Sequence, residues 1–144
     1  MYRYTTCGLE NIVLKNGYTI KETPYGTGVS IDDIDGLHRA IAADIIRKPS
    51  RMTGEEFRFL RKEQDLTQAE MAAILGVSEQ TVLAWERNRH GAVHAMPDMC
   101  MRAYYIAHIQ VSVPLANIFT TKDQEVLSEH AFEHRADGWL AMAA

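Results

Sequence analysis

The sequence has few of the residues that would indicate export or a zinc site. Its 144 residues include only two cysteines, Cys7 and Cys100, which lie far apart and belong to no C-x-x-C pair. Neither a disulfide framework nor a cysteine zinc site is therefore indicated. The N-terminus, MYRYTTCGLEN, lacks a basic region followed by an apolar one, and charges interrupt every apolar run before about 18 residues. We expect a cytoplasmic protein with reduced thiols and no membrane partner.

The chain also lacks a surplus of positive charge. Its net charge of -4 argues against a protein that coats nucleic acid without regard to sequence, because such a protein displaces counterions with many lysines and arginines. The distribution of charge is uneven. Residues 47–102 carry nine Lys or Arg against eight Asp or Glu, whereas both flanking segments are acidic. A footprint that touches few phosphates would fit this middle segment.

The N-terminal residues are predicted to form a small extension. NIVL and YTIK flank Asn16-Gly17, a dipeptide that favours a type I′ turn, so residues 10–22 are predicted to form a β-hairpin. PYGTGVSI follows as a loop or a short third strand, since Ile31 occupies the place of the third glycine of a dinucleotide-binding motif. From Asp33 to Arg47, apolar residues recur at helical spacing until Pro49 stops the pattern, which predicts an amphipathic helix.

Two capping boxes mark the starts of successive helices in the middle of the chain. Thr53-Gly-Glu-Glu56 predicts a helix over about residues 54–64, and Thr67-Gln-Ala-Glu70 opens a second helix that Gly76 ends. Ser78, a good N-cap, then starts a third helix that runs to Arg87. Two short helices joined by a tight glycine-containing turn are the geometry that places the second helix in a major groove about 12 Å wide.

The third helix has an inward and an outward side. Val82 and Trp85 recur at i, i+3 and are expected to face inward. Small or polar residues are left to face outward, namely Glu79, Gln80, Thr81 and Ala84. Such short side chains can approach base edges closely. Arg87 and Arg89 follow on the chain and are predicted to contact DNA as well.

Across LTQAEMAAILGVSEQTVLAWERNRHG, the sequence resembles the XRE family of lambda-repressor and Cro-like helix-turn-helix proteins. The resemblance covers roughly residues 53–109. It implies that Gln68 braces on the DNA backbone and that the first turns of the third helix read bases, through Ser78, Glu79, Gln80, Thr81 and Ala84. It also implies an ion pair between Arg61 and Glu86 that ties the recognition helix to the scaffold. Two unrelated surface charges are the alternative.

The layout, with an N-terminal module ahead of the helix-turn-helix, is similar to that of the MqsA-type antitoxins. The zinc ligands of that group are missing, because only Cys7 lies in the N-terminal third of the chain. This resemblance implies an antitoxin role as a more specific form of a regulator. It leaves a toxin or another protein partner open and assigns no toxin-binding residue.

Beyond the third helix, the pattern predicts a fourth helix that begins near Pro97, and a last helix after Thr121. The apolar side of the last helix would carry Val126, Leu127, Phe132 and Trp139. An H-x-x-E-H string at residues 130–134 has the spacing of inverted zinc peptidases, but a downstream third ligand is lacking. His90 and His94 also have ligand spacing, yet lie in an expected loop. We predict no metal site, no cofactor and no enzymatic activity.

Together these patterns predict a mainly α fold. A lambda-repressor-like helix-turn-helix bundle is expected over residues 51–112. A hairpin-and-helix extension should precede it over residues 1–50, and a C-terminal helical segment should follow over residues 113–144.

The predicted function is that of a sequence-specific DNA-binding transcriptional regulator, a repressor, that binds double-stranded DNA as a homodimer on a palindromic operator. Dimer contacts are expected from the hairpin of residues 10–22 or from the C-terminal helix, and the apolar side of that helix favours the latter. The alternative is a protein-interaction module that keeps the fold without reading DNA. Glu79 favours it, because a carboxylate repels phosphate, although it can also accept from cytosine N4.

Overall fold

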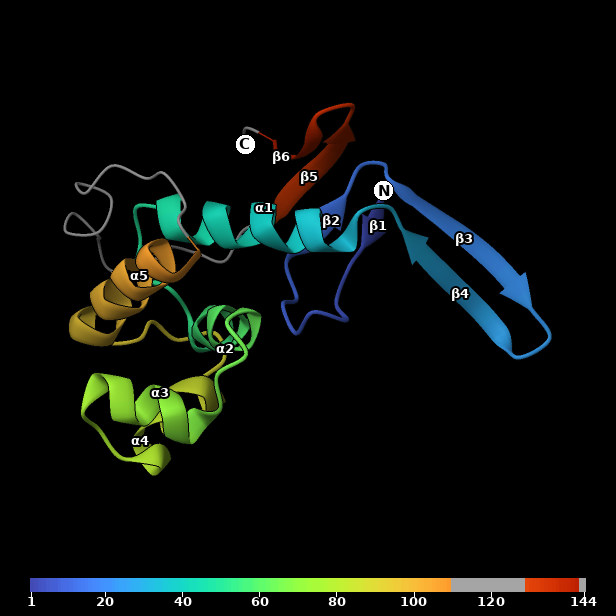
Figure 1. Cartoon of the computed structure of the whole chain (residues 1–144). Coiled ribbons are helices and arrows are strands. Elements are labelled where there is room, and N and C mark those ends of the chain that lie inside the picture. The colour runs from blue at the N-terminus through green and yellow to red at the C-terminus, as the bar shows by residue number, and fades with distance from the viewer. Residues whose placement is uncertain (110–128, 143–144) are drawn as a thin grey trace. The chain divides into compact units, whose positions relative to one another are not determined.

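The computed structural model describes residues 1–109 and 129–142, in which there are five helices and six strands (Figure 1). The chain divides into two compact units, one made of Met1–Ile41 with Ser128–Ala144 and the other of Ala42–Leu127. The helix α1 (Ile34–Arg47) contains the border between them. A mainly α fold with one N-terminal hairpin was predicted, and the structure has more strands than that. In the described ranges, no helix combines the length and the apolar character needed to cross a membrane.

The first unit is built on a four-stranded sheet with the order β1-β2-β5-β6. β1 (Tyr2–Arg3) pairs antiparallel with β2 (Ile12–Leu14), and β2 pairs in parallel with β5 (His130–Arg135). β6 (Gly138–Ala141) pairs antiparallel with β5. The buried apolar side chains of this unit are Tyr4, Leu9, Ile12, Val13, Leu14, Leu37, Ile41, Phe132 and Trp139.

The C-terminal helix predicted after Thr121 is wrong wherever the structure describes this segment. β5 and β6 are strands joined by a two-residue turn, after which Gly138 has a φ of 128°. Phe132 is fully buried, so it cannot belong to an exposed dimerisation stripe. Val126 and Leu127, like the predicted boundary at residue 113, lie outside the described residues.

The turn predicted at Asn16-Gly17 is also wrong. A type I′ turn needs positive φ at both residues, and only Gly17 has it, with a φ of 74°. The Asn16 side chain instead bonds the backbone of β5: its Nδ2 donates to the His134 carbonyl at 3.1 Å, and its Oδ1 accepts from the His134 N–H at 2.6 Å. A β-carbon at Gly17 would collide with the Trp139 ring. The dipeptide therefore packs against β5 and β6 and does not form the turn of a hairpin.

β3 (Tyr18–Thr23) and β4 (Gly26–Ile31) form a separate two-stranded ribbon (Figure 1). They pair antiparallel from Tyr18 opposite Ile31 to Thr23 opposite Gly26. The segment PYGTGVSI thus supplies a strand, one of the two predicted options, and its partner is β3. Every residue from 19 to 30 is exposed.

The second unit is helical where the structure describes it. α2 (Gly54–Glu63), α3 (Gln68–Leu75), α4 (Glu79–Arg87) and α5 (Ala95–Ile109) follow one another as predicted. Both predicted capping boxes are confirmed, at Thr53 and at Thr67. In the second box, the Thr67 N–H donates to the Glu70 carboxylate and lowers the pKa of that group. The apolar core comprises Ala42, Ile45, Ile46, Met52, Phe57, Phe59, Leu60, Met71, Ala72, Val82, Val93, Met101 and Tyr105.

A fully buried ion pair holds the α1–α2 linker against α5. Arg102 Nε lies 3.0 Å from Asp98 Oδ2, and neither side chain has any exposed surface. Asp98 Oδ1 also accepts from the Met52 N–H at 2.8 Å. The guanidinium donates to three further carbonyls, those of Ile46, Lys48 and Ser50. Because the linker's backbone groups are satisfied by α5, the start of α2 is fixed in place.

Candidate nucleic-acid interface

A tight turn joins α3 to α4. Gly76 adopts the left-handed conformation that ends α3, with φ 70° and ψ 33°. The Val77 N–H donates back to the Ala72 carbonyl at 3.0 Å. Ser78 then caps α4, with its Oγ accepting from the Thr81 N–H at 3.2 Å. The turn therefore has the form that the sequence predicted, and α4 follows α3 in close contact with it.

α4 has one anchored side and one open side. Val82 and Glu86 are buried, and the Trp85 ring meets the Phe57 ring edge-on, with 5.7 Å between centroids. The residues predicted to contact DNA are exposed or partly exposed: Ser78, Glu79, Gln80, Ala84, Arg87 and Arg89 are exposed, and Gln68 and Thr81 are intermediate. The outward side of α4 is thus accessible to a ligand.

The structure contains the ion pair that the sequence implied between Arg61 and Glu86. Arg61 Nε and Nη2 donate to the two Glu86 oxygens at 2.7 and 2.8 Å. Its Nη1 donates to the Leu66 carbonyl at 2.7 Å. The side chains are only 10% and 3% exposed. This bidentate geometry fixes the orientation of the last turn of α4 relative to α2.

Gln68, at the start of α3, is bonded to the same carboxylate. Its Nε2 donates to Glu86 Oε1 at 3.2 Å. Glu86 therefore accepts hydrogen bonds from both Arg61 and Gln68, which come from α2 and α3. One buried carboxylate on α4 thereby links the three helices, and it holds the Gln68 amide beside α4.

The loop after α4 is bonded to the beginning of α2. The N–H groups of Gly54 and Glu55 each donate at 3.1 Å, to the carbonyls of Gly91 and Arg89. Arg89 Nη2 also lies 3.5 Å from the buried carboxylate of Glu55. Arg89 thus has a structural partner besides its predicted role at DNA, whereas Arg87 lies exposed on α4.

Gly54 allows this close approach, because a β-carbon there would collide with the carbonyl oxygens of Trp85 and Asn88. We expect Gly54→Ala to lower the free energy of unfolding by about 1–3 kcal/mol, since backbone atoms must move to relieve the overlap. Chemical denaturation measures the change. Gly28→Ala is the control, because a β-carbon there meets only the Lys21 carbonyl, at 3.9 Å. Equal losses in the two variants would contradict the close packing at Gly54.

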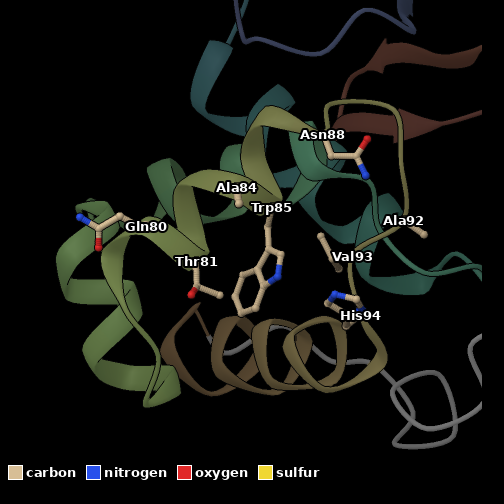
Figure 2. A pocket seen from close by; sticks show the side chains of 8 residues that line it. All are labelled: Gln80, Thr81, Ala84, Trp85, Asn88, Ala92, Val93 and His94. Atoms are coloured by element: carbon tan, nitrogen blue, oxygen red, sulfur yellow. The ribbon is translucent and has the colours of Figure 1, made fainter.

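A cavity of about 480 Å³ lies beside the open side of α4 (Figure 2). Residues of α4 and of the following loop line it, namely Gln80, Thr81, Ala84, Trp85, Asn88, Ala92, Val93 and His94. A ligand that reaches Gln80 or Thr81 through this hollow therefore also faces Asn88 and His94. These two were not among the predicted DNA-binding residues, because the helix was predicted to end at Arg87 and both residues follow that end.

The H-x-x-E-H string lies on the strand β5, which excludes the helical arrangement considered from the sequence. Along a strand, Glu133 faces the side opposite to His130 and His134. His134 stacks against Trp139, with 5.0 Å between the rings, and Glu133 pairs with Arg135 at 3.2 Å. These contacts are those of a sheet surface.

A family model described as helix-turn-helix matches residues 57–92. The match spans most of α2, all of α3 and α4, and the loop as far as Ala92. Residues 57–92 are thus similar to this helix-turn-helix family. Helix-turn-helix segments are typical of DNA-binding regulators, and in this chain the matched segment includes the Arg61–Glu86 pair and the Gly76 turn. Searches of curated proteins and of solved structures gave no match to the chain.

Proposed function

We propose that the protein is a sequence-specific regulator that inserts α4 into the major groove of double-stranded DNA. The observation that carries the proposal is the two-sided character of α4: Val82 and Glu86 hold it to the scaffold, while Glu79, Gln80 and Ala84 face solvent. A glutamine amide can bond adenine in a bidentate manner, and a small methyl side chain can contact the thymine methyl group. Glu79 accepts from cytosine N4 in this arrangement.

Residues around α4 fix its position on the DNA backbone in this proposal. Gln68 and Ser78 lie at the starts of α3 and α4, where free N–H groups favour phosphate oxygens. Arg87 and Arg89 supply positive charge at the other end of α4. Because these cations are few, the affinity depends on direct base contacts more than in a strongly basic protein.

The working unit in this proposal is a two-fold dimer on a palindromic operator. One recognition helix reads only a few base pairs, so a single module gives too little specificity for a genome. The two half-site centres lie roughly 34 Å, or a multiple of that, apart. Occupation of the operator makes the protein a repressor, and an antitoxin-type autorepressor with a toxin as partner is the more specific form.

Selection of operators from random duplexes by the purified full chain tests the proposal. We expect enrichment of a palindrome with half-sites one helical turn, or a multiple of it, apart. A chain that enriches no sequence would instead support the second candidate, a protein-interaction module with a helix-turn-helix fold. The exposed carboxylate of Glu79 on the open side of α4 is the observation that favours this second candidate.

Gln80→Ala and Thr81→Ala should each weaken binding to the selected operator by about 1–3 kcal/mol, because each removes a side chain that faces a base edge. Fluorescence anisotropy with labelled duplex measures the loss. Thr81 Oγ1 lies 2.8 Å from Ser78 Oγ, so thermal melts must show that the variant stays folded. Lys62→Ala, at an exposed position of α2, is the control. If both variants bind as tightly as the parent chain, α4 is not the reading helix.

A further inference from the structure

The β3–β4 ribbon has one polar face and one face that is apolar except for the Glu22–Thr27 pair near its tip. Tyr18 and Ile20 lie opposite Ile31 and Val29 on the apolar face. Tyr2 packs against Tyr18 at the base of the ribbon, with 5.4 Å between ring centroids. Farther out, Ile20 and Val29 are 54% and 36% exposed. An isolated two-stranded sheet is at best marginally stable, so this ribbon gains from a further partner.

The two edges of the ribbon differ in their protection against pairing. Natural edge strands are protected by charges, by proline or by being very short. β3 carries Lys21 and Glu22, and at the edges of the other sheet β1 has two residues and β6 has four. β4, with the sequence GTGVSI, is six residues long and has neither charge nor proline. Among the strands that the structure describes, β4 therefore presents the least protected long edge.

The alternation of bonded and non-bonded pairs between β3 and β4 shows which backbone groups of β4 point to its free edge. The Asp32 N–H donates to the Gly17 carbonyl at 2.9 Å, so Gly17 and Asp32 form a bonded pair. Bonded and non-bonded pairs alternate along antiparallel strands. With the register of the ribbon, the N–H and C=O groups of Thr27, Val29 and Ile31 consequently point away from β3.

We propose that β4 pairs antiparallel with β4 of a second copy of this chain, about a two-fold axis at Val29. This inference rests on the proposed function in one respect, since it supplies the two-fold dimer which that function requires. The pairing satisfies the outward N–H and C=O groups of Val29 with those of its counterpart. It extends the two ribbons into one four-stranded sheet.

The number of backbone-bonded pairs selects this register over its neighbours. With the axis at Val29, a row of four β-branched residues runs across the sheet: Ile20 and Val29 of one copy, then Val29 and Ile20 of the other. Cross-strand pairs of this kind stabilise sheets. An axis at Gly28 would form only two bonded pairs between the β4 strands, each of Val29 with Thr27, and an axis at Ser30 only two, each of Val29 with Ile31. The axis at Val29 forms three bonded pairs, Val29 with Val29 and Thr27 with Ile31 on either side of it, and it sets two valines face to face.

Engineered cysteines test the register. In a chain with Cys7→Ser and Cys100→Ser, Val29→Cys should form a disulfide-linked dimer under mild oxidation, because facing residues of an antiparallel pair are about 5.5 Å apart. Ile20→Cys is the matched control, because it lies on the same face but three strand spacings, about 14 Å, from its counterpart. Ile20 is also the more exposed of the two, so random collision would favour it. Cross-linking that is absent at Val29, or as fast at Ile20, would overturn the proposal.

A second measurement uses the chain with its native cysteines. Val29→Lys should raise the dimer dissociation constant in sedimentation experiments at least about tenfold, because two like charges would then face each other. Thr19→Lys adds the same charge on the polar face of β3 and should leave the constant unchanged. A Val29→Lys chain that dimerises as well as the parent overturns this inference and leaves the proposed function intact. If the chain dimerises through β4 but selects no operator, this inference stands and the proposed function is overturned. A parent chain that stays monomeric overturns both the inference and the dimeric operator model.

Discussion

Arg102→Met is expected to lower the free energy of unfolding by about 3–5 kcal/mol. The substitution leaves the Asp98 carboxylate fully buried without its cation. It also removes the donor for the carbonyls of Ile46, Lys48 and Ser50. An uncompensated buried charge costs far more than the packing of a methionine restores. Urea denaturation followed by circular dichroism measures the loss.

Two controls separate the buried pair from a general effect of losing an arginine. Arg58→Met makes the same change at an exposed position of α2 and should alter stability by less than about 0.5 kcal/mol. The double variant Arg102→Met with Asp98→Leu should recover part of the loss, because no lone charge remains buried. Similar losses for Arg102→Met and Arg58→Met would contradict the role assigned to the pair.

Arg61→Ala is the second change with a large expected effect, a loss of about 3 kcal/mol in the free energy of unfolding. Glu86, with a side chain 3% exposed, would keep only the bond from the Gln68 amide. Thermal melts compare it with Lys62→Ala, the exposed neighbour on the same helix, for which little change is expected. Equal melting temperatures in the two variants would remove the structural role of the Arg61–Glu86 pair.

The helices of the second unit could be predicted from the sequence because their determinants are local. Thr53 and Thr67 each bond a glutamate three positions on. Gly76 and Ser78 likewise end and start helices through bonds within a few residues. Such short-range chemistry is readable from one sequence, since it depends on no distant partner.

The strands of the first unit depend on partners that the sequence does not reveal. The Asn16 side chain bonds the backbone of His134, which is 118 positions away. This distant contact, and not the local sequence, determines that residues 16 and 17 do not form a hairpin turn. A local signal was present farther on, where Asp137-Gly138 follows the segment HAFEHR. In the structure, Phe132 is the one buried residue of that segment. The alternation of apolar and polar residues in this segment predicts a β-hairpin, but its charged residues are equally compatible with a helix.

The candidate site shows the same division. Exposure of Gln80 and Ala84 follows from helical periodicity and could be predicted. The contribution of Asn88 and His94 to the cavity beside α4 could not, because it depends on the path of the loop that Gly54 and Glu55 bind. The targets of Arg102 were hidden for a similar reason: its i, i+4 spacing to Asp98 is visible, but the linker carbonyls are not.

The parallel pairing of β2 with β5 also sets the order in which the chain can fold during synthesis. β2 finds its partner only when residues 130–135 have been made, and closing so long a loop makes this pairing slow. The unit Ala42–Leu127 is continuous, and its helices form from neighbouring residues. Because domains fold as units and N-terminal residues are made first, we expect α4 to be folded within its unit before the N-terminal sheet receives its last two strands.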